Sequence, residues 1–315
     1  MNNKYEKTEL RKMLAALLDE RMAKDNRVVV LDADLGASMG TMYLREKYPD
    51  RMIECGIAEQ NMTSLAAGLS SYGYIPFVFS FAPFVSRRVA DQIAVSIAYN
   101  KEKVVIVGTS PGITAELNGG THMTFEDVAM MRSFPDVLIF EPSDSIELAT
   151  AFDQIIDYPG MVYLRMDRKV LPALHSDDYK AVIGKVDVIK EGSDVTLFAS
   201  GIEVAEAYAA AEILEKDGIS AEVVNVHTIK PLDVEGVVAS VKKTGCAVTC
   251  ENHSVYGGLR SAITEALAEN YPAPVEAIGN HDRLGEVGKV PYLKQVYHLT
   301  AADIAEKAKK AISRK

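Results

Sequence analysis

The chain has 315 residues, of which 48% are hydrophobic and 25% charged, and it carries a net charge of −10. This composition is typical of a globular protein, and at roughly 150 residues per domain the length predicts two domains or one large one. The acidic balance disfavours nucleic-acid binding, which needs a concentrated basic face. No stretch approaches the ~18 apolar residues of a membrane span, so no membrane role is expected. Three cysteines, Cys55, Cys246 and Cys250, are too few for a disulfide framework and indicate the reducing cytoplasm.

The first half of the chain alternates short apolar runs with longer helical patterns. The apolar runs predict strands at residues 28–31, 77–79, 104–107, 137–140 and 161–164. The helical patterns predict helices at residues 6–23, 58–72, 84–99 and 145–156, the last beginning after Asp144. Because the strands lack polar alternation, we expect them to be buried on both faces, as in a parallel sheet covered by helices.

A second set of elements follows a polar, aperiodic stretch, residues 167–190, in which we place a linker at 171–188. Strands are predicted at 195–198, 221–226, 246–250 and 275–278, and helices at 203–216, 233–243, 257–271 and 300–312. The predicted fold class is therefore α/β, with two open, mostly parallel-sheet domains at residues 1–170 and 189–315.

The common nucleotide, zinc and hydrolase motifs are absent from the sequence. No GxGxxG, GxxxxGK[ST], HExxH or GxSxG pattern occurs, so we assign no metal ligand to this chain. In open parallel sheets, ligands bind in the loops after the carboxyl ends of the strands. We therefore expect a site among the loops at 32–38, 54–59, 80–84, 108–123, 165–168 and 251–258.

One of these loops combines a glycine and a carboxylate in an informative order. Gly56 ends an extended stretch, and Glu59 then falls in the first turn of a helix of small residues. An acid in a first turn complements the helix dipole, which is one interpretation. The other is a partly buried carboxylate that relays a proton. Local sequence alone leaves both open.

The segment Gly56–Asn61 (GIAEQN) resembles the pyrimidine-binding domain of transketolases and of 1-deoxyxylulose-5-phosphate synthase. The resemblance continues in order through FAPF at 81–84, GGTH at 119–122, FEDVAMMR at 125–132 and EPSD at 141–144. Farther on, IKPLD at 229–233 and ENHSVYGG at 251–258 are similar to the C-terminal domain of the same family. The motifs are collinear over almost the whole chain.

The resemblance implies thiamine diphosphate as the cofactor. Glu59 matches the glutamate that hydrogen-bonds the pyrimidine ring nitrogen N1′ and so favours the tautomer that accepts the C2 proton. Phe81 and Phe84 match the aromatic wall that stacks on the pyrimidine ring. In the loop after the first strand, Asp34 and Leu35 are further expected cofactor contacts. A third aromatic residue of many transketolases is Arg87 in this chain.

The family's diphosphate-binding GDG motif is absent, and the pyrimidine-type domain begins close to Met1. The chain is thus similar to the C-terminal half of a split transketolase. We expect a separate N-terminal subunit to hold the diphosphate and Mg²⁺ or another divalent cation. Two copies of each chain, related by a two-fold axis, would form a heterotetramer.

The resemblance also implies residues that contact sugar phosphates. His122 matches a histidine near the donor hydroxyls, and arginine suits phosphate because its planar fork meets two oxygens. Asn118 replaces a usual aspartate, and Ser110 replaces a usual histidine. The expected substrate-binding set is Arg168, Arg11, Ser38, Asn118, Ser110 and His122.

The predicted function is transfer of a two-carbon ketol unit from a ketose phosphate to an aldose phosphate, with Glu59 and His122 as catalytic residues. Substrates of the pentose phosphate pathway are the first expectation. Two alternatives decarboxylate a 2-oxoacid: a 1-deoxyxylulose-5-phosphate synthase-like enzyme and a 2-oxoacid dehydrogenase β-like subunit. A third is a non-catalytic regulatory or scaffolding paralogue. The second domain is assigned to assembly and stability, with His253 as an ordinary loop residue.

Overall fold

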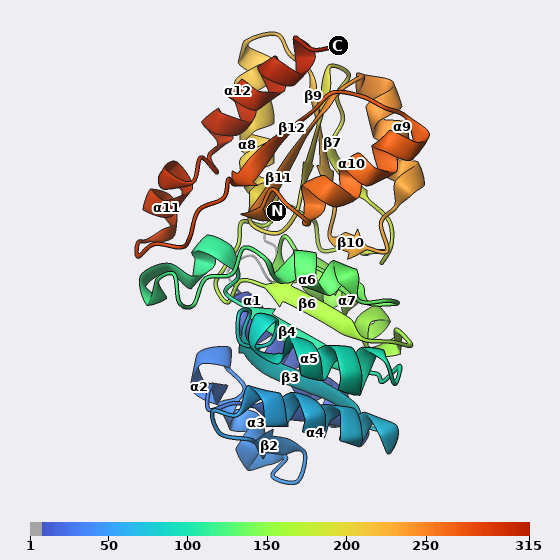
Figure 1. The fold of residues 1–315 in the computed structure, drawn as a ribbon, viewed down its shortest axis with the longest axis vertical. Helices are drawn as coiled ribbons and strands as arrows, with labels where there is room; N and C mark the ends of the chain where they lie inside the picture. The colour runs from blue at the N-terminus through green and yellow to red at the C-terminus, as the bar shows by residue number, and fades with distance from the viewer. Residues whose placement is uncertain (1–7) are drawn as a thin grey trace. The chain divides into compact units, whose positions relative to one another are not determined.

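A computed structural model describes residues 8–315, which divide into two compact units (Figure 1). The first unit holds the chain up to Pro111 together with Met130–Val182. The second holds Gly112–Ala129 together with Ile183–Lys315. Residues 112–129 therefore pack with the second unit, although they fall within the first predicted domain, residues 1–170.

The first unit is built on parallel strands in the order β5-β6-β4-β3-β1-β2. Nearly all of their residues are buried, because helices cover both faces of the sheet. The predicted parallel sheet is confirmed. Its strands are β1 (Val28–Asp32), β2 (Met52–Glu54), β3 (Ile75–Phe81), β4 (Val105–Thr109), β5 (Leu138–Phe140) and β6 (Val162–Met166).

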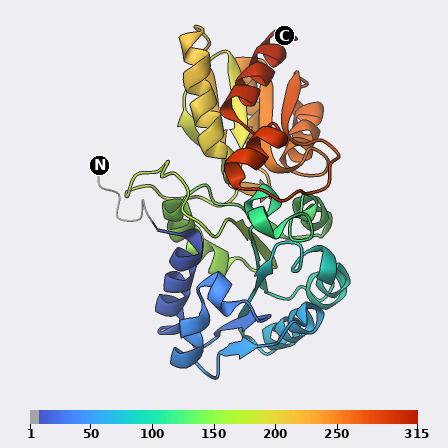
Figure 2. The ribbon, with the colours of Figure 1, turned by 90° about the vertical axis from the view of Figure 1, so that its left-hand side faces the viewer.

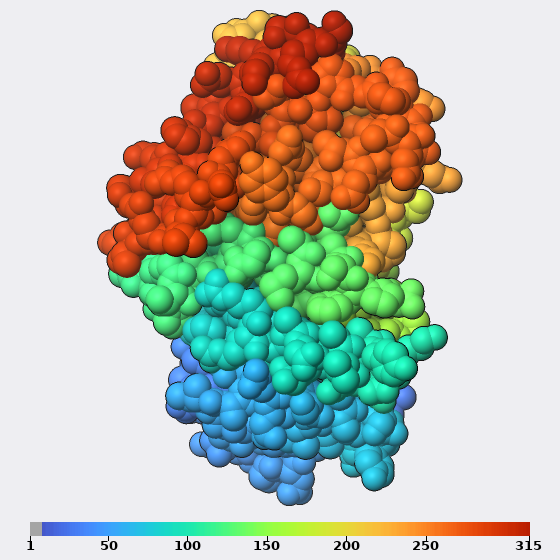
Figure 3. Space-filling model, in the orientation of Figure 1, coloured from blue at the N-terminus to red at the C-terminus, as the bar shows by residue number. Residues whose placement is uncertain are grey.

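Helices form a layer on each side of this sheet, as the turned view in Figure 2 shows. Helices α1 (Leu10–Met22) and α7 (Ser145–Asp157) pack together on one face. On the other face lie α4 (Glu59–Ser71), α5 (Ala90–Gln92) and η2 (Ile93–Ala98), whose side chains close over the strands in Figure 3. The shorter helices are α2 (Gly36–Met39), α3 (Met42–Lys47) and η1 (Arg87–Val89), and α6 (Asp127–Ser133) crosses the division of the chain at Ala129.

The predicted helices agree with the structure except at one place. The predicted continuous helix at 84–99 is wrong in detail: a 3₁₀ turn begins only at Arg87, and Ile93–Ala98 is a π-helix. Asp144 caps α7 as predicted, because its side chain accepts a hydrogen bond from the Glu147 amide at 2.8 Å. The helix predicted at 6–23 is observed from Leu10, and its residues 6–7 lie outside the described part of the chain.

The second unit contains a sheet in the order β12-β11-β8-β9-β7, parallel except for the β7–β9 pair. Helices α8 and α12 pack on one face, and α9 and α10 pack on the other (Figure 1). The strands of this sheet are β7 (Asp187–Lys190), β8 (Val195–Ala199), β9 (Ala221–Asn225), β11 (Ala247–Ser254) and β12 (Val275–Asn280), and the short strand β10 (Thr228–Lys230) lies outside it. The helices are η3 (Gly112–Asn118), α8 (Glu203–Lys216), α9 (Val234–Thr244), α10 (Leu259–Asn270), α11 (Val290–Val296) and α12 (Ala301–Ile312).

Two expectations about composition can be compared with these elements. All three cysteines are free thiols, and Cys246 and Cys250 are fully buried. Among the helices of residues 8–315, none is long and apolar enough to cross a bilayer.

Candidate active site

The expected site residues of the first unit gather at one edge of its sheet. Asp34, Leu35 and Ser38 follow β1, and Glu59 follows β2. Phe81 ends β3, Ser110 follows β4, and Arg168 comes two residues after β6. All these strands are parallel, so their carboxyl ends meet at the edge where open α/β sheets bind ligands.

Glu59 is the most buried carboxylate of this group. It opens α4 and leaves only 4% of its surface exposed. Its Oε1 accepts a hydrogen bond from Arg88 Nη1 at 2.6 Å, and the Arg88 guanidinium lies 3.9 Å above the Phe84 ring. The positive charge of Arg88 compensates the carboxylate that burial would otherwise destabilise. Arg88 thus ties the buried acid to the aromatic wall.

The Phe81 and Phe84 rings contact each other in the same site. Their ring centroids lie 5.9 Å apart in an edge-to-face arrangement at 81°. The Arg168 guanidinium lies 4.8 Å from the centre of the Phe81 ring, and Arg168 Nε donates to Ser110 Oγ at 2.7 Å. A continuous series of contacts therefore joins Glu59 to Ser110 across the edge of the sheet.

Arg165 and Arg168 are close in sequence, but their surroundings differ completely. Arg165 is fully buried within β6 and pairs with the buried carboxylate of Glu141. Arg168 lies beyond the strand and is half-buried. Of these two arginines, only Arg168 has its guanidinium at the edge of the sheet, beside Phe81 and Ser110.

The loop after β1 is held in a constrained shape by two carboxylates. Asp34 has a positive φ of 58°, and its amide donates to Glu54 Oε1 at 2.8 Å. The Leu35 amide donates to Asp32 Oδ1 at 2.9 Å, while Asp32 Oδ2 is buried without a hydrogen-bond partner. Burial raises the pKa of Asp32 to about 6, and the charge of Glu54 adds to the rise. Such strain is frequent where a loop meets a ligand.

Arg11 and Ser38, two of the expected substrate contacts, lie next to each other. Arg11 Nη1 donates to the backbone carbonyl of Ser38 at 2.8 Å, and Arg11 Nε pairs with Glu9. The Arg11 amide also donates to the carbonyl of Arg168 at 3.4 Å. The start of α1 is thus attached to the segment that carries Arg168.

Two expected substrate residues, Asn118 and His122, belong to the second unit. Asn118 is exposed at the end of η3, a helix with a kink at Glu116, where φ is 51° and ψ is −120°. His122 is half-buried, and its Nδ1 lies 2.9 Å from Thr121 Oγ1. Both residues lie in a loop whose ends are joined by a 2.9 Å hydrogen bond from the Gly112 amide to the Thr124 carbonyl.

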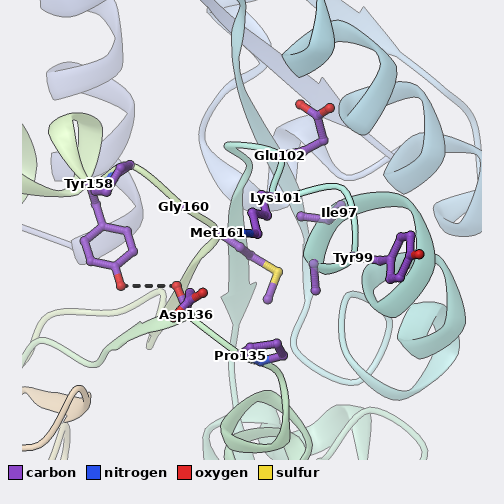
Figure 4. A pocket seen from close by; sticks show the side chains of 11 residues that line it. Ile97, Tyr99, Lys101, Glu102, Pro135, Asp136, Tyr158, Gly160 and Met161 are labelled. Atoms are coloured by element: carbon purple, nitrogen blue, oxygen red, sulfur yellow. Dashed lines mark hydrogen bonds between the residues drawn. The ribbon is translucent and has the colours of Figure 1, made fainter.

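Two surface pockets of the first unit differ in their relation to these residues. One, of about 460 Å³, is lined by Ile57, Ala58, Glu59, Gln60, Asn61 and Arg88. The other, of about 520 Å³, lies at the ends of the loops that precede β4, β5 and β6, with Tyr158 and Asp136 joined by a hydrogen bond on its wall (Figure 4). It is at the amino edge of the strands and contains none of the expected residues. The pocket beside Glu59 is therefore the candidate site.

Among residues 8–315, no group of three or more His, Cys, Asp or Glu side chains is arranged to hold a metal ion. The residues that sequence reasoning missed are Arg88 and Asp32. Arg88 is 29 positions from Glu59, so no local spacing links them. Asp32 falls at the start of the predicted loop 32–38 but ends β1 in the structure, and only its burial in the fold distinguishes it.

Comparison with known proteins agrees with this geometry. The family described as "Transketolase, pyrimidine binding domain" matches residues 6–173, and "Transketolase, C-terminal domain" matches residues 184–304. The chain belongs to the transketolase family. Both domain types predicted from the motifs are present, and in the predicted order.

Transketolases divided between two chains are among its relatives. The chain is 48% identical to the 6-deoxy-6-sulfo-D-fructose transketolase subunit SqwH of Clostridium sp. (strain MSTE9), covering 99% of this chain and 97% of that one. It is 38% identical to a putative transketolase C-terminal section of Methanocaldococcus jannaschii, covering 95% and 94%. A solved structure described as "Split gene transketolase, inactive beta4 tetramer" superposes with a TM-score of 0.88 at 39% identity, covering 98% and 99%. The prediction of a split-transketolase subunit is confirmed.

Proposed function

We propose that this transketolase chain acts with a separate N-terminal subunit to move a two-carbon ketol unit from an anionic ketose to an aldose phosphate. The observation that carries the proposal is the contact between Glu59 and Arg88 beside the Phe81–Phe84 wall. A buried carboxylate next to flat aromatic faces has the chemistry that an aminopyrimidine ring requires.

The residues at this edge fit thiamine diphosphate. That cofactor supplies the stabilised carbanion on which ketol transfer depends. Glu59 would hold a proton at the pyrimidine ring nitrogen, and Phe81 and Phe84 would orient the ring. Arg88 holds the Glu59 side chain in place through its hydrogen bond, while the loop with Asp34 and Leu35 would contact the cofactor from β1. Closing these apolar side chains around the ring would exclude water from the reacting carbon.

A partner subunit would bind the diphosphate of the cofactor and its divalent cation, most simply Mg²⁺. The sequence lacks the Gly-Asp-Gly motif that the family uses for this purpose. The split-gene relative, which is similar over nearly its whole length, is described as inactive when it forms a tetramer of β chains. We infer a heterotetramer with a two-fold axis as the active assembly, working in the cytoplasm.

The anionic end of the substrate would be bound by Arg168, Arg11 and the loop at Ser38. Arginine offers two parallel donors to a tetrahedral oxyanion, whether phosphate or sulfonate. His122 and Asn118 would contact the sugar hydroxyls through hydrogen bonds, and His122 would be the residue that passes a proton to or from the sugar.

A terminal sulfonate is the second candidate for the donor's anionic group. Ser110 stands where many transketolases have a histidine, and it accepts a hydrogen bond from Arg168. The relative at 48% identity is named for 6-deoxy-6-sulfo-D-fructose. We therefore include this sugar beside pentose phosphates as a donor.

The test is a donor comparison with the reconstituted complex, thiamine diphosphate and Mg²⁺. Xylulose 5-phosphate, fructose 6-phosphate and 6-deoxy-6-sulfo-D-fructose are each supplied with an aldose phosphate. Ketol transfer predicts an aldose two carbons shorter than the donor and a ketose two carbons longer than the acceptor, without CO₂. Release of CO₂ from pyruvate or another 2-oxoacid instead would contradict the proposal and favour a decarboxylating subunit. Cofactor binding without either reaction would favour a non-catalytic paralogue.

A further inference from the structure

The loop that carries Asn118 and His122 is attached to the second unit, to which the sequence assigns only assembly and stability. Residues 112–129 group with Ile183–Lys315 in the fold. A hydrogen bond from the Gly112 amide to the Thr124 carbonyl closes the base of this loop. The residues of the second unit that contact the loop therefore determine where its tip lies. This inference rests on the proposed function, because it concerns how those two residues are presented to a sugar.

Strand β11 holds the base of the loop through consecutive residues. Buried Asn252 accepts a hydrogen bond from the Ile113 amide at 3.0 Å through its Oδ1. The Ser254 amide donates to the carbonyl of Phe125 at 2.9 Å. These two bonds fix the chain on both sides of Asn118 and His122. An unpaired buried amide at Ile113 would be costly, so the Asn252 contact is a strong constraint.

His253 lies between these two residues and is buried, whereas the sequence suggests an ordinary loop position. Its Nδ1 is 2.7 Å from the Ser254 carbonyl, so this nitrogen carries the proton. The other nitrogen, Nε2, accepts from the Ala129 amide at 3.4 Å and faces Asp127 Oδ1 at 3.9 Å. His253 therefore fixes the end of the segment where α6 begins.

The far side of the loop meets residues 284–297. A Cβ atom at Gly120 would come within 2.5 Å of the Gly285 carbonyl oxygen, so only glycine permits this approach. Glu116 Oε1 accepts from the Val290 amide at 3.3 Å, and the Phe125 and Tyr297 rings lie 5.4 Å apart. The tip of the loop is therefore shaped by backbone contact as well as by its base.

We propose that Asn252 and the Gly120–Gly285 contact are positioning elements for substrate binding, through which the C-terminal domain sets the geometry of Asn118 and His122. None of these three residues needs to touch the sugar. Their loss should weaken donor binding while leaving the cofactor site of the first unit unchanged, because Glu59 and its partners belong to the other unit.

The test uses Asn252→Ala and Asn252→Asp in the reconstituted complex. Asn252→Ala removes the acceptor for the Ile113 amide, so hydrogen exchange of the peptide covering 112–124 should accelerate. The donor KM should rise about five- to tenfold, the cost of one buried hydrogen bond, with unchanged affinity for thiamine diphosphate. Asn252→Asp keeps the Oδ1 acceptor and should recover most of the loss. Asn270→Ala is the matched control, because its side chain bonds only within α10, to the Ala266 carbonyl.

A second variant keeps the test decisive if Asn252→Ala misfolds. Gly120→Ala adds a Cβ atom that clashes with the Gly285 carbonyl and should push the loop away from it. Gly68→Ala is the control, because a Cβ atom at Gly68 meets nothing within 4 Å. Faster hydrogen exchange of residues 112–124 with an unchanged donor KM would overturn the positioning role. Unchanged hydrogen exchange in both Asn252→Ala and Gly120→Ala would overturn it as well. Absence of ketol transfer in the wild-type complex would instead refute the proposed function, whereas the exchange data would still report on the attachment.

Discussion

Arg88 Nη1 lies 2.6 Å from Glu59 Oε1, and the same guanidinium covers the Phe84 ring. One arginine thereby connects the buried carboxylate at the start of α4 to the aromatic residues that follow β3. Glu59 follows β2 and Arg88 follows β3, two parallel strands that end at the same edge of the sheet with β1 between them. A charge-compensated acid beside an aromatic wall is what distinguishes this edge from the rest of the first unit.

Replacing Glu59 by Gln should abolish most turnover without unfolding the chain. The carboxylate is buried, but its partner Arg88 is 40% exposed and can be solvated when the pair is broken. Loss of a positioned acid–base group reduces kcat by about 10²–10⁴-fold. Steady-state kinetics of the complex measure this, and circular dichroism reports the fold. Glu46→Gln, at an exposed position of the same unit, is the control; near-wild-type turnover from folded Glu59→Gln would refute the role.

Replacing Arg88 by Ala should destabilise the fold by removing the partner of the buried Glu59 carboxylate. We expect a coupling free energy of about 1 kcal/mol between the two side chains, limited by the exposure of Arg88. A double-mutant cycle with Glu59→Gln measures it from the free energies of unfolding. Arg88→Lys keeps the charge but not the planar contact with Phe84, and should be intermediate. Additive effects of the two substitutions would show that the pair is not coupled.

Replacing Arg168 by Ala should raise the KM for the anionic donor by about 10–100-fold, the range for a lost charge-assisted hydrogen bond. Cofactor affinity should be unaffected. Arg168→Lys retains charge without the planar fork and should recover only part of the loss. Arg27→Ala, which removes an exposed pair with Asp25, serves as control. An unchanged donor KM in Arg168→Ala would exclude this arginine from the anion site.

Replacing Asp32 by Asn should stabilise the chain at neutral pH. The pKa of Asp32 is raised to about 6 in the fold from its ordinary 3.8, so the folded state retains a proton that the unfolded state has lost. Wild-type stability therefore falls as the pH rises through this window and is lowest, for this group, above pH 6. Urea unfolding should show an advantage of about 1–3 kcal/mol for Asp32→Asn at pH 7.5 that shrinks toward pH 4. An advantage independent of pH would contradict the assignment.

The strands and long helices were predictable because their signals are local. The apolar run Val28–Leu31 is long enough to identify β1. Asp144 is a residue type that often caps helices, so it predicts the start of α7. The sequence does not predict the antiparallel edge strand β7 (Asp187–Lys190), because a half-exposed strand of four residues shows no clear alternation. It predicts ordinary helix where Ile93–Ala98 forms a π-helix, since six residues do not distinguish the two periods.

The sequence predicts only those residues of the candidate site that lie within a recognisable motif. Glu59, Phe81 and Phe84 were found through their resemblance to a family, not through physics visible in one sequence. The contact from Ile113 to Asn252 spans 139 positions, so no spacing rule could attach the His122 loop to the second unit. Long-range partners such as these are fixed by the topology of the folded chain.

The most direct measurement of the central claim is ketol transfer by three samples: this chain, an N-terminal transketolase subunit, and the two combined. Each is assayed with thiamine diphosphate, Mg²⁺, an anionic ketose donor and an aldose phosphate. We expect transfer only in the combined sample, and loss of transfer when the Glu59→Gln chain replaces the wild-type chain. Transfer by this chain alone, or by the combined sample with Glu59→Gln, would contradict it.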